Sequence, residues 1–511
     1  MLRSVILFIT FVIVQSNKCA HRSFGQDSIV CVCNATYCDR IYQSRLQAGQ
    51  FQLYTSSKSG ERLQFTTGNF STKPVNGTLL IINSTQQYQK VHGFGGAFTD
   101  SSVLNIRSLS NRTRRKLLES YFAAPGNGIG YTYINVPIAG TDFATRPYSY
   151  DDTPHDSALR NFSLVNEDNY RIEYLHEIKN IMSNSNNLRL LCSSWAAPAW
   201  MKTSNETTWG ILKREYYQTY ANYLKKYFDA YKKHNISFWG FIPAHEPLAG
   251  FDTNNWYNGM GWSPNASAFW AVNYLAPTLK RAGYNPAYIA YDDERANILS
   301  YVEDVFRNKK ANKLYTGISV HWYLDPIVSP MILTETHNRF PDKFLLITEV
   351  FNGVPGYQTD VGVLLGLWSR GESYAADIIQ NFQHSLNAYV DFNLVLNEHG
   401  GPNWSGKFAD AAIIVAPEHD EFYKQPNYYA MAHFSSFVPR NSRRISSTGL
   451  ENNQNVSAVA FLTPEEKIVV VTINKGDKPI NITLKHNNTG HIINLYLSAH
   501  SLYTVLYHNR R

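Results

Sequence analysis

The chain has 511 residues, of which 44% are hydrophobic and 17% are charged, and its formal net charge at pH 7 is +7. A chain of this length and composition can bury a large core and has room for two or three domains. Its positive charges are scattered, which excludes a basic stripe for nucleic acid and leaves a mild attraction to anionic lipids as the expectation.

Residues 1–16 are predicted to form a cleaved signal peptide. Arg3 precedes the apolar run 5–14, which is too short to cross a bilayer, since a spanning helix needs about 20 residues. The chain also carries thirteen Asn-x-Ser/Thr sequons, among them Asn34, Asn76, Asn161 and Asn455. Together these features predict a secreted or lumenal glycoprotein.

Four cysteines gather in the next segment, 17–42: Cys19, Cys31, Cys33 and Cys38. In an oxidising compartment such a cluster favours two disulfides over a zinc site, because no histidine falls at ligand spacing around it. We therefore expect a disulfide-bearing N-terminal β segment. Cys192 stands alone after an apolar run and is expected to be a buried thiol.

From residue 91 to 430 the pattern alternates between apolar runs and amphipathic helical stretches such as 216–232. The runs are 92–97, 130–136, 188–192, 238–242, 288–291, 317–322, 344–348 and 391–396. Alternation of this kind predicts a parallel sheet, and eight repeats predict a closed (β/α)8 TIM barrel.

Beyond residue 430 the helical pattern is expected to stop. Short strands separated by turn residues such as Lys475-Gly476-Asp477 predict an additional all-β domain over 431–511. The strand-like stretches of 43–90 are expected to join it in a β-sandwich built from both ends of the chain.

Two glutamates end apolar runs of the predicted barrel. Glu246 follows the fourth run and Glu349 follows the seventh, at the carboxyl ends of strands, where TIM barrels hold their active sites. A pair of carboxylates can cleave a glycosidic bond without a cofactor or metal, and none is expected. The competing interpretation of each glutamate taken alone is a surface or salt-bridging residue.

Aromatic and acidic residues follow the same strand ends. Trp195, Trp322 and Tyr323 could present flat apolar faces to a sugar ring, although tryptophan in a barrel is commonly core. Asp142 follows the second run, where it could accept hydrogen bonds from sugar hydroxyls or cap a helix.

Several segments carry a resemblance over nearly the full mature length. They are 31–38, Gly93-Phe94-Gly95-Gly96-Ala97, Val320-His321-Trp322-Tyr323-Leu324-Asp325, 398–404 and Phe422-Tyr423-Lys424-Gln425-Pro426. The chain resembles the lysosomal acid glucosylceramidases of glycoside hydrolase family 30. The resemblance implies a retaining β-glucosidase with Glu246 as acid/base and Glu349 as nucleophile, and with Asp142, Trp195 and Tyr323 against the glucosyl unit.

The resemblance carries further implications. It pairs Cys19 with Cys31 and Cys33 with Cys38. It also implies glucosylceramide at a membrane surface as substrate, a saposin-type activator as partner, and the lysosome, reached by the secretory pathway, as location.

Some positions depart from the family pattern. His245 replaces an asparagine before the acid/base, Asn135 replaces an arginine near the nucleophile, and Phe392 replaces a tryptophan of the pocket; Phe351 and Lys407 differ as well. If His245 is protonated, its charge beside Glu246 favours the ionised form of Glu246. The loss of the arginine at position 135 removes a charge that would favour the ionised form of Glu349. The mechanism needs a protonated acid/base and an ionised nucleophile, and both changes work against these protonation states. The alternative prediction is therefore a low-activity or non-catalytic homologue that binds glycolipid or sugar.

Overall fold

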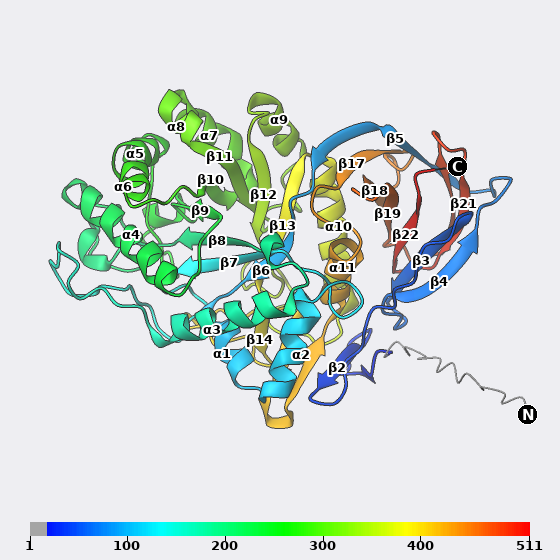
Figure 1. Cartoon of the computed structure of the whole chain (residues 1–511), viewed down its shortest axis with the longest axis horizontal. Coiled ribbons are helices and arrows are strands. Elements are labelled where there is room, and N and C mark those ends of the chain that lie inside the picture. The colour runs from blue at the N-terminus through cyan, green and yellow to red at the C-terminus, as the bar shows by residue number, and fades with distance from the viewer. Residues whose placement is uncertain (1–17, 511) are drawn as a thin grey trace, which may run out of the picture.

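The computed structural model describes residues 18–510 (Figure 1). The expected signal peptide lies outside the described residues. Within 18–510, no helix is both long and apolar enough to cross a membrane.

A closed barrel of eight parallel strands forms the centre of the molecule, in the order β10-β11-β12-β13-β6-β7-β8-β9. The strands are β6 Gly93–Ala97, β7 Tyr133–Ile138, β8 Arg189–Ser194, β9 Gly240–Ile242, β10 Ala287–Glu294, β11 Tyr315–His321, β12 Phe344–Glu349 and β13 Leu386–Asn393. The predicted TIM barrel is confirmed.

The eighth strand lies earlier than expected. Residues 386–393 pair with β12 and β6, whereas Val395–Asn397 forms β14 in a different sheet. Buried polar residues interrupt the apolar pattern of β13. One of them, Asn387, accepts a hydrogen bond from the Leu345 N–H (2.8 Å) and donates to the Lys90 carbonyl (2.8 Å). These hydrogen bonds allow the polar Asn387 side chain to be buried in a core strand. The apolar pattern of the sequence alone did not include this residue in the strand.

Helices surround the barrel between successive strands (Figure 1). They are α1 Asp100–Arg107, α2 Asn111–Phe122, α3 Asn166–Ile181, α4 Tyr217–Lys233, α5 Pro264–Trp270, α6 Ala276–Arg281, α7 Ile298–Arg307, α8 Lys309–Leu314, α9 Met331–Arg339 and α10 Trp368–Gln383. In α4, Tyr220, Leu224, Tyr227 and Tyr231 are buried. Their spacing of three and four residues places them on one helix face, which packs towards the barrel.

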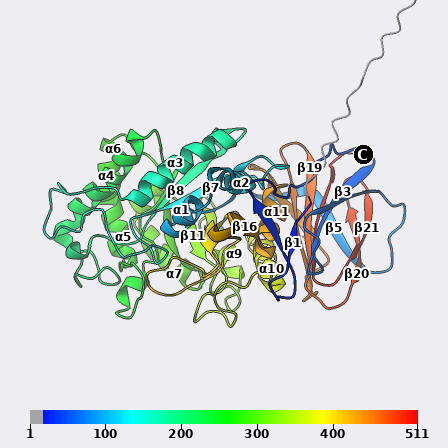
Figure 2. The ribbon, with the colours of Figure 1, turned by 90° about the horizontal axis from the view of Figure 1, so that it is seen from below.

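A nine-stranded sheet forms the sandwich. It lies beside the barrel, at one end of the molecule, as Figure 2 shows from below. Its strands are β3 Gln50–Ser57, β4 Gln64–Asn69, β5 Thr78–Lys90, β17 Arg443–Thr448, β18 Val456–Leu462, β19 Lys467–Asn474, β20 Ile480–His486, β21 Ile492–Leu497 and β22 Ser501–His508. Segments from both ends of the chain thus share one sheet. Helix α11, Pro426–Ser435, crosses residue 430, where helices were expected to stop, and packs against both α10 and the sandwich.

The N-terminal segment is part of a separate five-stranded sheet. Strands β1 His21–Arg22 and β2 Val30–Asn34 join β16 Glu421–Lys424, β15 Ile413–Ala416 and β14 in the order β1-β2-β16-β15-β14. The structure contains both disulfides, Cys19–Cys31 and Cys33–Cys38.

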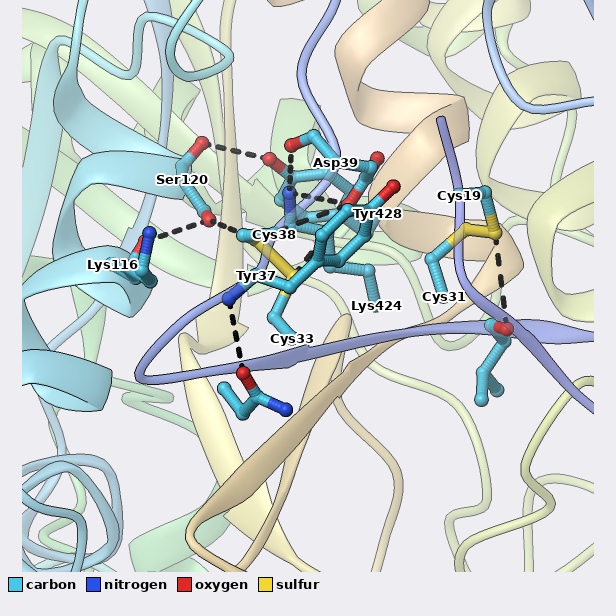
Figure 3. The surroundings of a disulfide bond; sticks show 12 residues. Cys19, Cys31, Cys33, Tyr37, Cys38, Asp39, Lys116, Ser120, Lys424 and Tyr428 are labelled. Carbon is cyan, nitrogen blue, oxygen red and sulfur yellow. Dashed lines mark hydrogen bonds and ion pairs between the residues drawn. A yellow bond between two sulfur atoms is a disulfide. The ribbon is translucent and has the colours of Figure 1, made fainter. Parts of the chain in front are cut away.

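An ion pair lies next to the Cys33–Cys38 bridge (Figure 3). The buried Lys424 ammonium lies 3.0 Å from an Asp39 carboxylate oxygen, and the Tyr429 hydroxyl donates to the other oxygen at 2.7 Å. The ion pair attaches the N-terminal segment to β16, while the bridge closes a short loop within that segment. Cys192 is buried, and within the described part of the chain it forms no disulfide.

Candidate active site

The two predicted glutamates meet at the carboxyl ends of the barrel strands. Glu349 is the last residue of β12, and Glu246 follows β9 in a left-handed conformation with φ of 37°. The Glu246 N–H donates to the Asp292 carbonyl at 2.9 Å, which holds this unusual backbone in place. A carboxylate oxygen of Glu246 lies within 4.8 Å of one of Glu349. The closed barrel therefore brings together two carboxylates that are 103 positions apart in the numbering.

His321, at the end of β11, lies between the two carboxylates. Its Nδ1 is 2.9 Å from Glu246 Oε1, and its Nε2 is 4.0 Å from Glu349 Oε2. Each glutamate also accepts a hydrogen bond from a phenol: Tyr257 donates to Glu246 Oε2, and Tyr323 donates to Glu349 Oε1 at 2.7 Å. The two carboxylates are thus oriented by His321 at the end of β11, by Tyr323 just after it, and by Tyr257 later in the connection that follows β9.

The His245 ring points to Asp292 and Glu349 and makes no hydrogen bond to the Glu246 carboxylate. Its Nδ1 lies 3.0 Å from Asp292 Oδ2, and its Nε2 faces Glu349 Oε2 at 3.8 Å. The ring stacks on Trp195 with centroids 3.8 Å apart. The His245 N–H donates to the Ser194 carbonyl at 2.9 Å, which fixes the backbone that carries the ring.

A buried aspartate supports both histidines from below. Asp292 Oδ1 accepts hydrogen bonds from Ser319 (2.8 Å) and Thr348 (2.6 Å), while Oδ2 contacts His245. Burial by itself would raise the pKa of Asp292, but the contacts with His245 and His321 outweigh burial and hold it well below its usual value. Asp292 therefore remains ionised.

The two glutamates have opposite electrostatic surroundings. Burial raises the pKa of Glu349 well above its usual value, and the charges of Glu246 and Asp142 add to this. Burial acts on Glu246 in the same direction, but the His321 hydrogen bond and the charge of His245 outweigh it and lower its pKa. For His321, burial is outweighed by Glu349, Asp292 and Glu246, which raise its pKa well above the usual value. The site therefore contains a cationic imidazole between unequal carboxylates.

The pocket in front of the glutamates has aromatic walls. Its lining residues are Asp142, Trp195, His245, Glu246, Trp256, Tyr257, Tyr323, Glu349, Phe351, Val354 and Tyr357. No helix begins at Asp142, so the capping interpretation is wrong for this part of the described chain. Burial raises the pKa of Asp142 to about 7, and its Oδ2 lies 3.4 Å from the Asn403 amide nitrogen.

Two expected aromatic positions lie elsewhere. Trp322 packs edge-on against Tyr374 of α10, with centroids 5.3 Å apart, instead of lining the pocket. Phe392 lies one layer behind the wall, stacked on Trp195 (5.9 Å) and Phe351 (5.6 Å). Trp322 turns outward because the next residue, Tyr323, is the one that faces Glu349.

The sequence analysis missed three residues that hold the glutamates and histidines in place, as well as the lining residues Trp256, Val354 and Tyr357. His321 is the second-last residue of the sixth run and Asp292 follows the fifth, so the rule that selected the glutamates, a polar residue at a strand end, could have found both. Tyr257 lies in a long loop, and no local pattern indicated that its hydroxyl reaches Glu246.

The chain matches known proteins over almost its whole length. The Glycosyl hydrolase family 30 TIM-barrel domain matches residues 91–438, and the Glycosyl hydrolase family 30 beta sandwich domain matches residues 441–505. The lysosomal acid glucosylceramidase of Mus musculus is 36% identical over 501 residues, with 96% of both chains covered. Putative glucosylceramidase 3 of Caenorhabditis elegans is 36% identical over 95% of this chain and 93% of its own.

Solved structures share the fold. SrfJ from Salmonella typhimurium superposes with a TM-score of 0.82 at 24% identity, covering 90% of this chain and all of its own. The barrel, the sandwich, the two strand-end glutamates and the relatives lead to one conclusion: the chain belongs to glycoside hydrolase family 30 and is a glycoside hydrolase.

Proposed function

We propose that the protein is a retaining β-glucosidase that hydrolyses glucosylceramide to glucose and ceramide. The observation that carries the proposal is the spacing of the two carboxylates, with oxygens within 4.8 Å. Retaining glycosidases place their carboxyl groups about 5–5.5 Å apart, whereas inverting enzymes need about 6.5–9.5 Å to admit a water molecule. The short spacing favours a double displacement.

In the first step Glu246 donates a proton to the glycosidic oxygen while Glu349 attacks the anomeric carbon, which releases ceramide and forms a glucosyl ester. In the second step Glu246 removes a proton from water, and the hydroxyl replaces Glu349 at the anomeric carbon, which releases glucose. Tyr323, which donates to Glu349, steadies the nucleophile. Trp195 and Asp142 of the pocket wall are positioned to contact the sugar.

A lipid substrate is supported by exposed apolar side chains on loops of the same barrel face. Phe251 follows β9, Ile327 follows β11, and Tyr357 follows β12; their exposed fractions are 52%, 80% and 55%. Such residues favour contact with a membrane surface. We propose that a saposin-type activator and anionic lipids assist this contact, and that the protein works in the lysosome after secretory transport.

One observation favours the alternative of a low-activity homologue that binds glycolipid. The first step needs a proton on Glu246 and a charge on Glu349, but the surroundings lower the pKa of Glu246 and raise that of Glu349. Substrate must therefore shift a proton from one glutamate to the other before the bond breaks.

Covalent capture distinguishes the two functions. Purified mature protein would be treated with a mechanism-based β-glucoside epoxide at mildly acidic pH and digested for mass spectrometry, and glucose release from glucosylceramide vesicles would be followed in parallel. We expect label on Glu349, none in Glu349→Gln, and unchanged labelling in the control Glu303→Gln, which alters a solvent-exposed pair with Arg339. Wild-type protein without label on Glu349 would contradict the proposed hydrolysis.

A further inference from the structure

The two oxygens of Glu246 have different neighbours. Glu246 Oε1 lies 2.9 Å from His321 Nδ1, and Glu246 Oε2 accepts a hydrogen bond from the Tyr257 hydroxyl. Because His321 is buried and cationic, its Nδ1–H donates to Oε1 and leaves no place there for an acidic proton. The proton that Glu246 gives to a glycosidic oxygen therefore has to sit on Oε2, the oxygen that Tyr257 contacts.

The Tyr257 hydroxyl favours the ionised form of Glu246. Burial raises the pKa of Tyr257 well above its usual value, and the charge of Glu246 adds to this, so the phenol keeps its proton and donates it. A hydrogen bond donated to a carboxylate stabilises the charged form. A glycosidic oxygen, in contrast, carries no proton and can only accept. Tyr257 and the substrate thus require opposite protonation states of the same oxygen.

The pocket leaves little room in front of Glu246. Its cavity volume is about 30 Å³, enough for about one water molecule, whereas pockets for small ligands measure about 300–1,000 Å³. The Tyr257 and Trp256 rings form one wall, with centroids 4.9 Å apart. The Asn255 amide donates to the Tyr257 carbonyl at 2.9 Å and holds the backbone. Entry of a glucosyl unit therefore requires movement of a lining side chain, and rotation of Tyr257 vacates the place beside Oε2.

Glu349 can supply the proton that Glu246 lacks. Burial raises the pKa of Glu349 well above its usual value, so Glu349 holds a proton at mildly acidic pH. One of its oxygens lies within 4.8 Å of one of Glu246, a gap that rotation of either carboxyl group shortens. Tyr323 donates to Glu349 Oε1 at 2.7 Å and stabilises the charge that remains after the proton leaves.

We propose that the Tyr257 hydroxyl occupies the leaving-group position in the free protein, and that the glycosidic oxygen of the substrate displaces it from Glu246 Oε2. Exchange of a donor for an acceptor moves one proton: the O–H bond of the Glu349 carboxyl breaks, its electron pair stays on Glu349, and Oε2 of Glu246 gains the proton. A correctly seated leaving group thus creates both the protonated acid and the ionised nucleophile. This proton transfer rests on the proposed function, whereas the displacement also applies to a homologue that only binds.

Other titratable groups act on Glu246 from the surrounding elements. They are Asp142 after β7, His245 after β9, Asp293 and Glu294 of β10, His321 and Tyr323 at and after β11, and Glu349 of β12 with Tyr357 beyond it. All of these groups are present with or without the Tyr257 hydroxyl. A comparison of Tyr257→Phe with the wild type therefore isolates the contribution of that hydroxyl.

Ligand binding tests the displacement without turnover. The probe is octyl β-thioglucoside, whose glycosidic sulfur resists hydrolysis, titrated calorimetrically into mature wild type and Tyr257→Phe at mildly acidic pH. Phenylalanine keeps the ring but lacks the hydroxyl that the probe has to displace, so we expect about tenfold tighter binding by the variant. The matched control is Tyr496→Phe, which removes the hydroxyl of an exposed tyrosine of β21 and should bind as the wild type does.

Steady-state kinetics with octyl β-glucoside provide a second readout. In the free wild type, protonation of Glu246 breaks the Tyr257 hydrogen bond, which holds the acidic limb of the kcat/KM profile at low pH. In Tyr257→Phe this limb should move to higher pH by about one unit. KM should fall about tenfold while kcat stays within about twofold, since the hydroxyl is already displaced when the glycosidic bond breaks.

Equal or weaker probe binding by Tyr257→Phe at an unchanged melting temperature would overturn the displacement, and so would an acidic limb that stays in place. A tyrosine that only supports the pocket wall predicts a lower kcat and an unmoved limb. If neither protein releases glucose while the variant still binds the probe more tightly, the proposed hydrolysis fails and the displacement stands.

Discussion

Replacing His433 by glutamine should make the protein less sensitive to acid. His433 lies in α11 with no solvent exposure, and its two ring nitrogens contact Thr504 Oγ1 of β22 (2.8 Å) and Ser56 Oγ of β3 (2.9 Å). The histidine thus connects the helix to the sandwich through neutral hydroxyls. Burial lowers its pKa to about 3, because these partners do not compensate a charged ring.

The sign and size of the effect follow from linkage. Since the folded-state pKa is below the unfolded value of about 6.5, the unfolded chain takes up the proton first, and stability falls as pH drops from about 6.5 towards 3. At pH 5, about 1.5 units below the unfolded pKa, the loss is about 2 kcal/mol. His433→Gln removes this loss because glutamine keeps polar contacts but does not titrate in this range.

The assay is urea unfolding of wild type and variant at pH 7 and pH 5. Between these values the wild type should lose about 2 kcal/mol more unfolding free energy than His433→Gln, whatever the variant costs at pH 7. His155→Gln, which alters an exposed histidine, should follow the wild type. Equal pH dependence in wild type and His433→Gln would refute the assignment of this acid sensitivity to His433.

Further predictions concern the site, the N-terminal segment and the sequons. Tyr323→Phe removes the 2.7 Å hydrogen bond to Glu349 and should lower kcat by about tenfold to a hundredfold, since such bonds to charged groups contribute about 1.5–3 kcal/mol; steady-state kinetics with an unchanged melting temperature would check this. Replacing Cys33 and Cys38 together by serine opens a loop with a sequence separation of 5 and should cost about 2 kcal/mol in urea unfolding. Asn403 is buried and donates towards Asp142, so glycopeptide mapping should find it unmodified while exposed Asn161 and Asn455 remain open to glycans.

The barrel and its two glutamates could be predicted from the sequence because their signals are local. An apolar run indicates a buried strand, and the residue after the run lies at the strand's carboxyl end. This pattern located Glu246 and Glu349. The same logic failed for β13, where buried Asn387 and Asp391 form hydrogen bonds with partners distant in sequence. It also misassigned Trp322, because which of two neighbouring side chains faces the pocket depends on the loop conformation after β11.

The sequence by itself determined the architecture, the cysteine-rich segment and the strand-end positions of the two carboxylates, since hydrophobic periodicity and strand order are encoded along the chain. Only the tertiary structure decided how these residues act on one another. Closure of the barrel brings His321 between Glu246 and Glu349, and it turns His245 towards Asp292 and Glu349. Distances of a few ångströms between strands remote in sequence decide proton positions, because electrostatic and hydrogen-bond energies depend steeply on separation and burial.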